Sequence, residues 1–312
     1  MKRFFLITLV LSVVLLGCQK VENTQGSSFS SENKMSVVTT IGMIGDVAAN
    51  IGGERVDAYS MMGAGVDPHL YKAKAGDLNR LNKADLILYN GLHLEAKMGD
   101  VLAQLSKTRN IKAIEDGITE DTLIITDQAH DPHIWFDVSN WMIASNIILE
   151  ALIRTDPDGE AYYRENHAIY LQKLKDLDAY TKEKAFTIPE ERRILITAHD
   201  AFNYFGRAYG FEVKGLQGIS TVDEASTSDV RELADYIAEN KIRSLFVESS
   251  VSDKSIRALQ AAVKSRGWNV EIGGELFSDA MGNTGTFEGT YIGMVTHNID
   301  TIVAGLSLEE KQ

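Results

Sequence analysis

The tripeptide Asp-Pro-His occurs twice in this sequence, as Asp67-Pro68-His69 and as Asp131-Pro132-His133. The chain has only four prolines and seven histidines, so chance is a poor explanation for the repeat. Proline fixes its own φ and pushes the preceding residue towards extended backbone, so each tripeptide is a stiff loop that presents an imidazole. The aspartate can cap the turn or orient the ring. Either tripeptide alone would be read as a surface turn, but together they indicate two ligands of one site.

Two further residues are placed where ligands of such a site would lie. His199 comes just beyond the carboxyl end of an apolar strand predicted at 194–196, and ligands of open α/β sheets bind at such ends. Asp279 follows another strand by a few residues and precedes a glycine-containing loop. In isolation, His199 could equally start a helix and Asp279 could be a helix N-cap. Glu248, at the end of a third strand, is a weaker candidate for a supporting or structural role.

The remaining histidines are weaker candidates. His130 lies three residues before His133, so both could approach one ion from a rigid loop, and it is kept as a minor alternative. His93, His167 and His297 fall on predicted helices or polar surface and are expected to be bystanders.

Imidazole nitrogens combined with a carboxylate suit zinc, manganese, iron or related ions, whereas calcium and magnesium prefer oxygen cages. Histidine binds a metal in its deprotonated form, so the metal affinity is expected to fall when the pH drops below the reference histidine pKa of about 6.5. Three histidines and a water would also make a catalytic zinc site. A fourth protein ligand would occupy the position of that water, and the sequence has no HExxH motif.

The chain begins like an exported lipoprotein. Lys2 and Arg3 precede an apolar run at 4–16, which is shorter than the roughly 20 residues needed to span a bilayer. The run ends at Leu15-Leu16-Gly17-Cys18, which resembles a bacterial lipobox, and Cys18 is the only cysteine. We therefore expect a signal peptide at 1–17, lipidation of Cys18 and a flexible tether at 18–35. An ordinary signal peptide is the alternative.

The charge of the chain argues against nucleic acid as a partner. The formal net charge is −13, and loss of Lys2 and Arg3 with the signal makes it −15. An acidic surface repels phosphate backbones and weakly concentrates cations, although charge alone specifies no ligand.

Strand-like and helical patterns alternate along the rest of the chain, which predicts an α/β protein with parallel sheets. Strands are predicted at 37–41, 86–89, 111–114, 194–196, 211–213, 245–247 and 270–272, and helices at 44–51, 230–239 and 256–266. We expect two (β/α) lobes, an N-terminal lobe at 36–158 and a C-terminal lobe at 188–312.

A different pattern separates the two lobes. Residues 160–186 contain neither Gly nor Pro, and Tyr163, Tyr170, Leu174 and Leu177 form a narrow apolar stripe. One helix of that length would reach roughly 40 Å. We expect a single rigid connecting helix at 159–187, with two shorter helices packed on one domain as the alternative.

The motifs together resemble the cluster A-I solute-binding proteins, the TroA/ZnuA/PsaA-type metal receptors of ABC importers. The resemblance covers nearly the whole chain after the tether. It is carried by Asp67-Pro68-His69-Leu70-Tyr71, Asn90-Gly91-Leu92-His93-Leu94-Glu95, Asp131-Pro132-His133-Ile134-Trp135-Phe136-Asp137, His199-Asp200-Ala201-Phe202-Asn203-Tyr204-Phe205 and Asp279.

This resemblance implies one Zn²⁺ or Mn²⁺ ion held by His69, His133, His199 and Asp279 in the cleft between the lobes. Manganese receptors of the family usually have Glu at the third place, so His199 implies a TroA-like receptor of mixed zinc and manganese capacity. The long His/Asp-rich loop of dedicated zinc receptors is replaced by the short stretch 127–130.

The partner implied by the resemblance is the membrane permease of an ABC importer, and the receptor would be a lipid-anchored monomer on the extracytoplasmic face. A surface adhesin with a structural metal is the alternative. Because a long helix resists wide hinge closure, release is expected to use small lobe tilts and loop movement near His199 and Asp279.

Overall fold

The computed structural model describes residues 29–126 and 129–307. The predicted signal, Cys18 and the first part of the predicted tether therefore lie outside the described residues, as do residues 127 and 128. Within the range predicted for the tether, Phe29 is buried in the core and strand β1 begins at Met35. A short turn, in which the backbone N–H of Ser30 bonds to the carbonyl of Asn33, connects the two.

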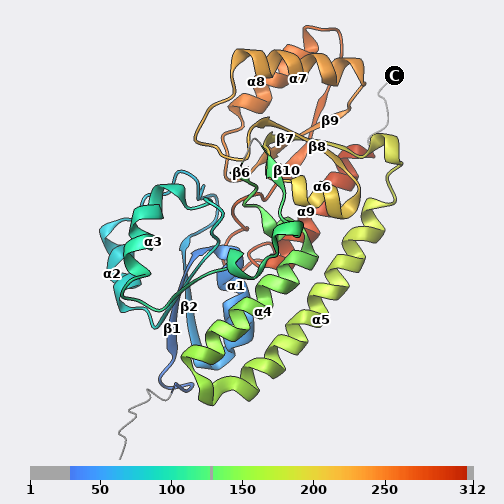
Figure 1. The fold of residues 1–312 in the computed structure, drawn as a ribbon. Helices are drawn as coiled ribbons and strands as arrows, with labels where there is room; N and C mark the ends of the chain where they lie inside the picture. Colours follow the sequence, from blue (N-terminus) through green and yellow to red (C-terminus); the bar gives the residue numbers. More distant parts are fainter. Residues whose placement is uncertain (1–28, 127–128, 308–312) are drawn as a thin grey trace, which may run out of the picture.

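The N-terminal lobe is built on a parallel sheet with the strand order β2-β1-β3-β4. Helices α1 and α4 cover one face of this sheet, and α2 and α3 cover the other (Figure 1). The antiparallel pair β5-β6 leads into the second Asp-Pro-His loop. The elements are β1 Met35–Ile41, α1 Gly42–Gly52, β2 Val56–Met62, α2 Ala75–Lys83, β3 Leu86–Tyr89, α3 Gly99–Leu105, β4 Ile111–Ala113, β5 Ile125–Thr126, β6 Ala129–His130 and α4 Val138–Thr155.

Strand β2 was not predicted, and its position in the sheet explains why. It is an edge strand with the sequence VDAYSMM, in which only Val56, Met61 and Met62 are buried. A strand of this composition lacks the continuous apolar run of a central parallel strand. Helix α1 packs so closely on β2 that a Cβ at Gly45 would lie 2.0 Å from Ser60 Oγ.

The C-terminal lobe repeats the α/β pattern with two parallel strand pairs, β7-β8 and β9-β10, and β7 also lies beside β9. Helices α7 and α8 cover the outer side of these strands, and α6 and α9 lie on the side towards the N-terminal lobe (Figure 1). The elements are β7 Ile194–His199, α6 Asn203–Tyr209, β8 Glu212–Gln217, α7 Thr227–Glu239, β9 Ser244–Glu248, α8 Lys254–Lys264, β10 Glu271–Leu276 and α9 Tyr291–Leu306.

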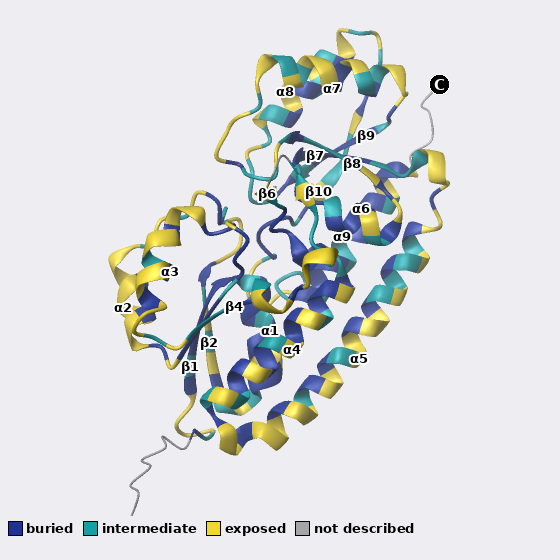
Figure 2. Ribbon diagram, viewed as in Figure 1, coloured by how far each residue is buried: buried dark blue, intermediate teal, exposed yellow. Residues whose placement is uncertain are grey.

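A single helix, α5 Glu160–Ala185, runs along both lobes (Figure 1). Its buried side, visible in Figure 2, includes the apolar stripe predicted from the sequence, Tyr163, Tyr170, Leu174 and Leu177. This side packs on α1 and α4 of the N-terminal lobe and on α6 and α9 of the C-terminal lobe. One apolar cluster is continuous across these helices, and a second fills the space under α7 and α8. The predicted fold class, two α/β lobes joined by one long helix, is confirmed.

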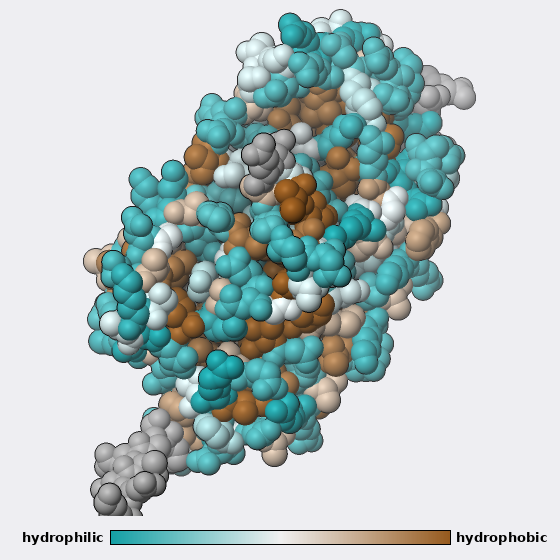
Figure 3. Space-filling view, in the orientation of Figure 1, coloured by the Kyte–Doolittle hydropathy of each residue, from teal (hydrophilic) through white to brown (hydrophobic). Residues whose placement is uncertain are grey.

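Among the described residues, no helix is both long enough and apolar enough to cross a membrane. The face drawn in Figure 3 is largely hydrophilic, with hydrophobic residues gathered mainly towards its middle.

Candidate metal centre

The loop of His133 is fixed by the aspartate that precedes it. Asp131 Oδ1 accepts the backbone N–H of His133 at 2.9 Å and its ring Nδ1–H at 2.7 Å. With Nδ1 as the donor, the lone pair of the ring lies on Nε2, where a metal would bind. Asn203 and Tyr204 of α6 hold Asp131 in turn, because the Asn203 amide donates to Oδ2 and the Tyr204 hydroxyl donates to the backbone carbonyl.

The loop of His69 uses the same turn with a different anchor. Asp67 Oδ1 accepts the backbone N–H of His69 at 2.8 Å, as Asp131 does for His133. The other oxygen of Asp67 accepts the hydroxyl of Thr221 at 2.6 Å, and Thr221 belongs to the opposite lobe. The repeated tripeptide therefore builds two similar turns, each with one histidine directed into the cleft.

His199 is the last residue of β7, and Glu248 is the last residue of the neighbouring β9. Glu248 Oε1 accepts the backbone N–H of His199 at 2.9 Å, and Oε2 accepts the ring Nδ1–H at 2.6 Å. Glu248 thus orients His199 as Asp131 orients His133, which is the supporting role considered from the sequence. His199 does not start a helix, since α6 begins only at Asn203.

Asp279 lies three residues after β10, on a loop that is clamped from both sides. Asn298 of α9 accepts the backbone N–H of Phe277 at 2.9 Å and donates to its carbonyl at 2.7 Å. The indole of Trp135 donates to the carbonyl of Ser278 at 3.1 Å. Asp279 is not a helix N-cap, because α9 begins at Tyr291 with Thr290 as its cap.

The structure brings His69, His133, His199 and Asp279 together in one buried cluster. The Nε2 atom of His133 lies 3.4 Å from that of His69 and 3.3 Å from that of His199. The carboxylate oxygens of Asp279 lie 3.3 Å from His133 Nε2, 3.3 Å from His199 Nε2 and 3.6 Å from His69 Nε2. Metal bonds of about 2.0–2.1 Å in tetrahedral geometry give ligand–ligand distances of about 3.3–3.4 Å. The spacing therefore fits one ion at the centre.

The carboxylate of Asp279 supplies an independent test of that fit. Both of its oxygens are buried, and neither has a hydrogen-bond partner among the described residues. A buried carboxylate without hydrogen bonds is costly unless positive charge compensates it, which the rings of His133 and His199 supply when protonated and a bound ion supplies when it displaces their protons. The histidines are directed at these oxygens through their Nε2 atoms, and all four side chains are at most 2% exposed. The cluster has the composition and the burial of a closed four-ligand metal site.

The electrostatics of the cluster differ from one histidine to the next. Burial lowers the pKa of His69 to about 4, helped by repulsion from the other two rings. Burial also opposes the charged form of His133, but the carboxylates of Asp131 and Asp279 outweigh it and raise the pKa to about 9. At His199, Glu248 and Asp279 outweigh burial and hold the pKa well above its usual value. The two imidazoles overcome the effect of burial on Asp279 and hold its pKa well below the usual range.

The other histidines lie away from this cluster. His130, the minor alternative, is on β6 and its Nε2 pairs with Glu120 Oε1 at 2.9 Å. His93 lies in a turn with a positive φ, and His297 of α9 bonds to the carbonyl of Glu275. His167 lies on the predicted helix, α5, and is buried against α4 with its Nε2 at 3.0 Å from Ser145 Oγ.

Several supporting residues were not identified from the sequence. Asn203 and Tyr204 stand within a quoted motif, so their positions were visible but their contact with Asp131 was not. Trp135 also stands within a quoted motif, but its contact with Ser278 was not visible. Thr221 and Asn298 gave no signal, because each acts on a residue at least 21 positions away and only the fold brings them together.

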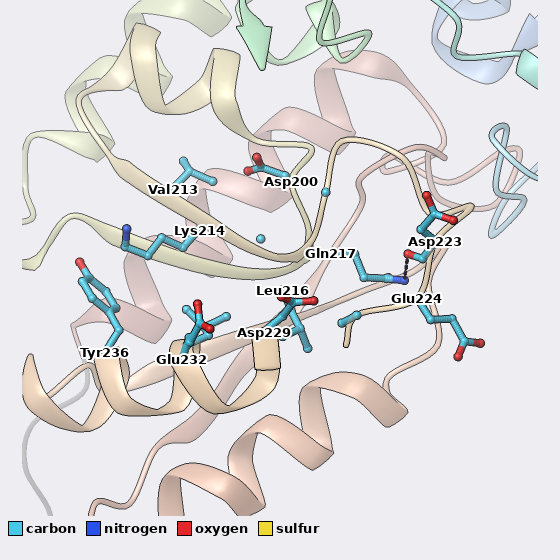
Figure 4. A pocket seen from close by; sticks show the side chains of 14 residues that line it. Asp200, Val213, Lys214, Leu216, Gln217, Asp223, Glu224, Asp229, Glu232 and Tyr236 are labelled. Atoms are coloured by element: carbon cyan, nitrogen blue, oxygen red, sulfur yellow. Dashed lines mark hydrogen bonds between the residues drawn. The ribbon is translucent and has the colours of Figure 1, made fainter. Parts of the chain in front are cut away.

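A separate pocket of about 620 Å³ lies between β8 and α7 (Figure 4). Its lining is rich in carboxylates, including Asp200, Asp223, Glu224 and Glu232, but none of the four clustered residues lines it. Asp200, the neighbour of His199 in the chain, is one of the lining residues, and burial raises the pKa of its carboxyl group. The pocket is therefore adjacent to the metal cluster without being part of it.

Comparison with known proteins places these features in a family. The family model described as "ZnuA: Zinc-uptake complex component A periplasmic" matches residues 37–305. The chain is 53% identical over 279 residues to the zinc-binding protein TroA of Treponema pallidum, covering 89% of this chain and 91% of TroA. It is 45% identical over 294 residues to the manganese-binding lipoprotein MntA of Bacillus subtilis, covering 94% and 95%.

The fold agrees with these relatives. The solved structure of the periplasmic zinc-binding protein TroA from Treponema pallidum superposes with a TM-score of 0.87 at 53% identity, covering 88% of this chain and all of TroA.

Proposed function

This chain belongs to the ZnuA family of periplasmic zinc-uptake components, and we propose that it captures one zinc or manganese ion and delivers it to an ABC importer. It is a metal-binding solute receptor, since similar proteins are named as zinc- and manganese-binding proteins and as substrate-binding lipoproteins of metal ABC transporters. The receptors of this family are binding proteins rather than enzymes.

The ligands in this proposal are His69, His133, His199 and Asp279. The observation that carries it is the pair of buried Asp279 oxygens, which have no hydrogen-bond partner among the described residues and face three Nε2 atoms. Four protein ligands at tetrahedral spacing leave no position for a reactive water, so the cluster suits capture rather than hydrolysis. Irving–Williams ordering favours zinc over manganese at such a site, so affinity alone does not select the cargo.

The partner in this proposal is the membrane permease of the importer. We infer that Cys18, outside the described residues, carries the lipid and that the receptor works as a monomer on the extracytoplasmic face. We propose the following domains: a signal peptide at 1–17, a tether from Cys18, an N-terminal lobe to residue 158, the connecting helix at 159–187 and a C-terminal lobe to residue 312.

Two measurements test this function. Uptake of radioactive zinc and manganese should fall in cells that lack the protein and return when the wild-type gene is restored. The His133→Ala variant, present at the same level on the cells, should not restore uptake. Metal analysis of protein purified from its own cells should find one ion per chain, and its identity gives the cargo. Uptake that is equal with and without the protein would overturn the proposal.

A further inference from the structure

The four proposed ligands are so deeply buried that the ion cannot leave without movement of the chain. His199 is held within its own lobe, whereas the loops of His133 and Asp279 are also held across the lobes, by Asn203 and Tyr204 of α6 on Asp131 and by the indole of Trp135 on Ser278. Glu248 fixes His199 within the C-terminal lobe, and Asn298 fixes the loop of Asp279 there. The loop of His133 continues into α4, which packs along α5.

The cross-lobe contact of the His69 loop differs in its place, because Thr221 lies outside the helices α1, α4, α6 and α9 that pack on α5. The backbone N–H of His69 bonds to Asp67, whose other oxygen accepts the hydroxyl of Thr221. The His69 loop leads from β2 to α2, and the loop of Thr221 leads from β8 to α7. Helix α2 lies on the side of the N-terminal lobe away from α5 (Figure 1). Since the lobes are joined along α5, a small tilt separates them most at this distant side.

The segment 218–226 that carries Thr221 is fixed at its ends and has free space beside it. At one end, Gln217 is the register partner of His199 in the β7-β8 pair. At the other end, Ser226 and Asp229 form a reciprocal cap at the start of α7. Between the ends, the carbonyl of Asp223 accepts a hydrogen bond from the side-chain amide of Gln217 at 3.2 Å.

Between these ends, Gly218, Asp223, Glu224 and Ala225 line the pocket of about 620 Å³ (Figure 4). An open space of this size removes the packing that would otherwise hold a segment in one position.

We propose that the segment 218–226 is a latch, in which Thr221 holds the His69 loop across the cleft and sets the rate at which the ion leaves. Opening the latch removes the support of His69, and the ion then loses its first ligand while the other three remain in place. This assigns the first movement to the His69 side of the cleft, rather than to the loops of His199 and Asp279. Thr221 is a positioning residue, because it acts on His69 through Asp67.

The inference rests on the proposed metal site, and the experiment separates the two. The full-length protein is loaded with zinc, mixed with an excess of a chromogenic chelator, and the release of zinc is followed over time. Thr221→Val removes the hydroxyl and keeps the shape of the side chain, whereas Thr221→Ser keeps the hydroxyl. Ser220→Ala is the matched control, because among the described residues Ser220 Oγ accepts its hydrogen bond from the backbone N–H of Val222, within the same segment.

Thr221→Val should bind one ion per chain and release it about tenfold faster, as expected for losing a hydrogen bond to a charged group. Thr221→Ser and Ser220→Ala should release zinc at close to the wild-type rate. Equal rates for Thr221→Val and the wild type, or equal acceleration in Ser220→Ala, would overturn the latch. Failure of the wild-type protein to bind zinc would instead overturn the proposed function.

Discussion

The Nε2 atoms of His133 and His199 lie 3.3 Å apart although the two residues belong to different lobes. His69 also comes from the N-terminal lobe, and Asp279 comes from the C-terminal lobe. An ion bound by all four residues crosslinks the lobes with two bonds to each side. In that arrangement the ion fixes the position of one lobe relative to the other, which gives a transporter a way to recognise the loaded form.

The first prediction concerns the identity of the ligands. His133→Ala should reduce bound zinc from one ion per chain to a small fraction. The site then has three ligands and an empty position where the imidazole was, and such a site binds zinc weakly. His130→Ala is the matched control in the same loop, since His130 pairs with Glu120 instead of the cluster. Metal analysis after dialysis measures both variants. Loss of the ion in His130→Ala, with retention in His133→Ala, would reverse the assignment.

The second prediction concerns Glu248, which touches His199 and no other proposed ligand in the described contacts. Glu248→Gln should weaken zinc affinity by about 10–100-fold, the usual cost of losing a carboxylate that orients a ligating histidine. Stoichiometry should stay at one ion per chain. Competition with a chelator of known affinity gives the constant, and wild-type affinity in this variant would mean that the carboxylate has no influence on the ion.

The third prediction tests the connecting helix. Leu174 of α5 is fully buried against the core, so Leu174→Ala should lower the free energy of unfolding by about 2–5 kcal/mol. Ile169, on the same helix, is 55% exposed, and Ile169→Ala should change the free energy of unfolding by less than about 0.5 kcal/mol. Urea unfolding measures both. If the two variants were equally stable, the packing of Leu174 against the core would not stabilise the protein.

The fourth prediction concerns the anchor, whose residue lies outside the described part of the chain. Cys18→Ala should abolish incorporation of a radioactive fatty acid and leave the protein uncleaved or released in soluble form, because no other cysteine can be acylated. Equal labelling of the variant and the wild type would exclude Cys18 as the acylated residue.

Much of this structure could be predicted because the signals were local. The Asp-Pro-His turns depend on the backbone restriction of proline, and the stripe from Tyr163 to Leu177 depends on helical periodicity. Strand β2 was not predicted, because an edge strand needs few apolar residues and its sequence lacks an apolar run. The contacts of Thr221 with Asp67 and of Asn298 with Phe277 depend on packing between distant segments, which leaves no mark in the sequence around either residue.

The fifth prediction concerns pH, where the structure shifts the expectation drawn from the sequence. Ordinary histidines would bind metal fully above about pH 6.5. In the metal-free protein, however, nearby carboxylates raise the pKa of His133 to about 9 and that of His199 well above its usual value, whereas His69 has a pKa of about 4. At pH 7 two of the three rings therefore carry a proton that the ion must displace.

Binding of zinc at pH 7 should accordingly release about two protons per ion, and affinity should still rise between pH 7 and pH 9. The stability of the metal-free protein changes with pH in the opposite direction to the metal affinity. A raised histidine pKa stabilises the fold fully below about pH 6.5 and loses this contribution as the pH approaches 9, so the stabilisation by metal should grow over this range.

Calorimetric titration with zinc at pH 7, in two buffers of different ionisation enthalpy, counts the released protons directly. Glu248→Gln provides the internal control, because Glu248 is the main group that raises the pKa of His199. Without that carboxylate the number should fall towards one, while the contribution of His133 persists through Asp131. Release of no protons by the wild-type protein at pH 7 would mean that all three rings are already neutral. The carboxylates would then orient the histidines without holding their protons, and the affinity would be flat above pH 6.5, as the sequence alone suggests.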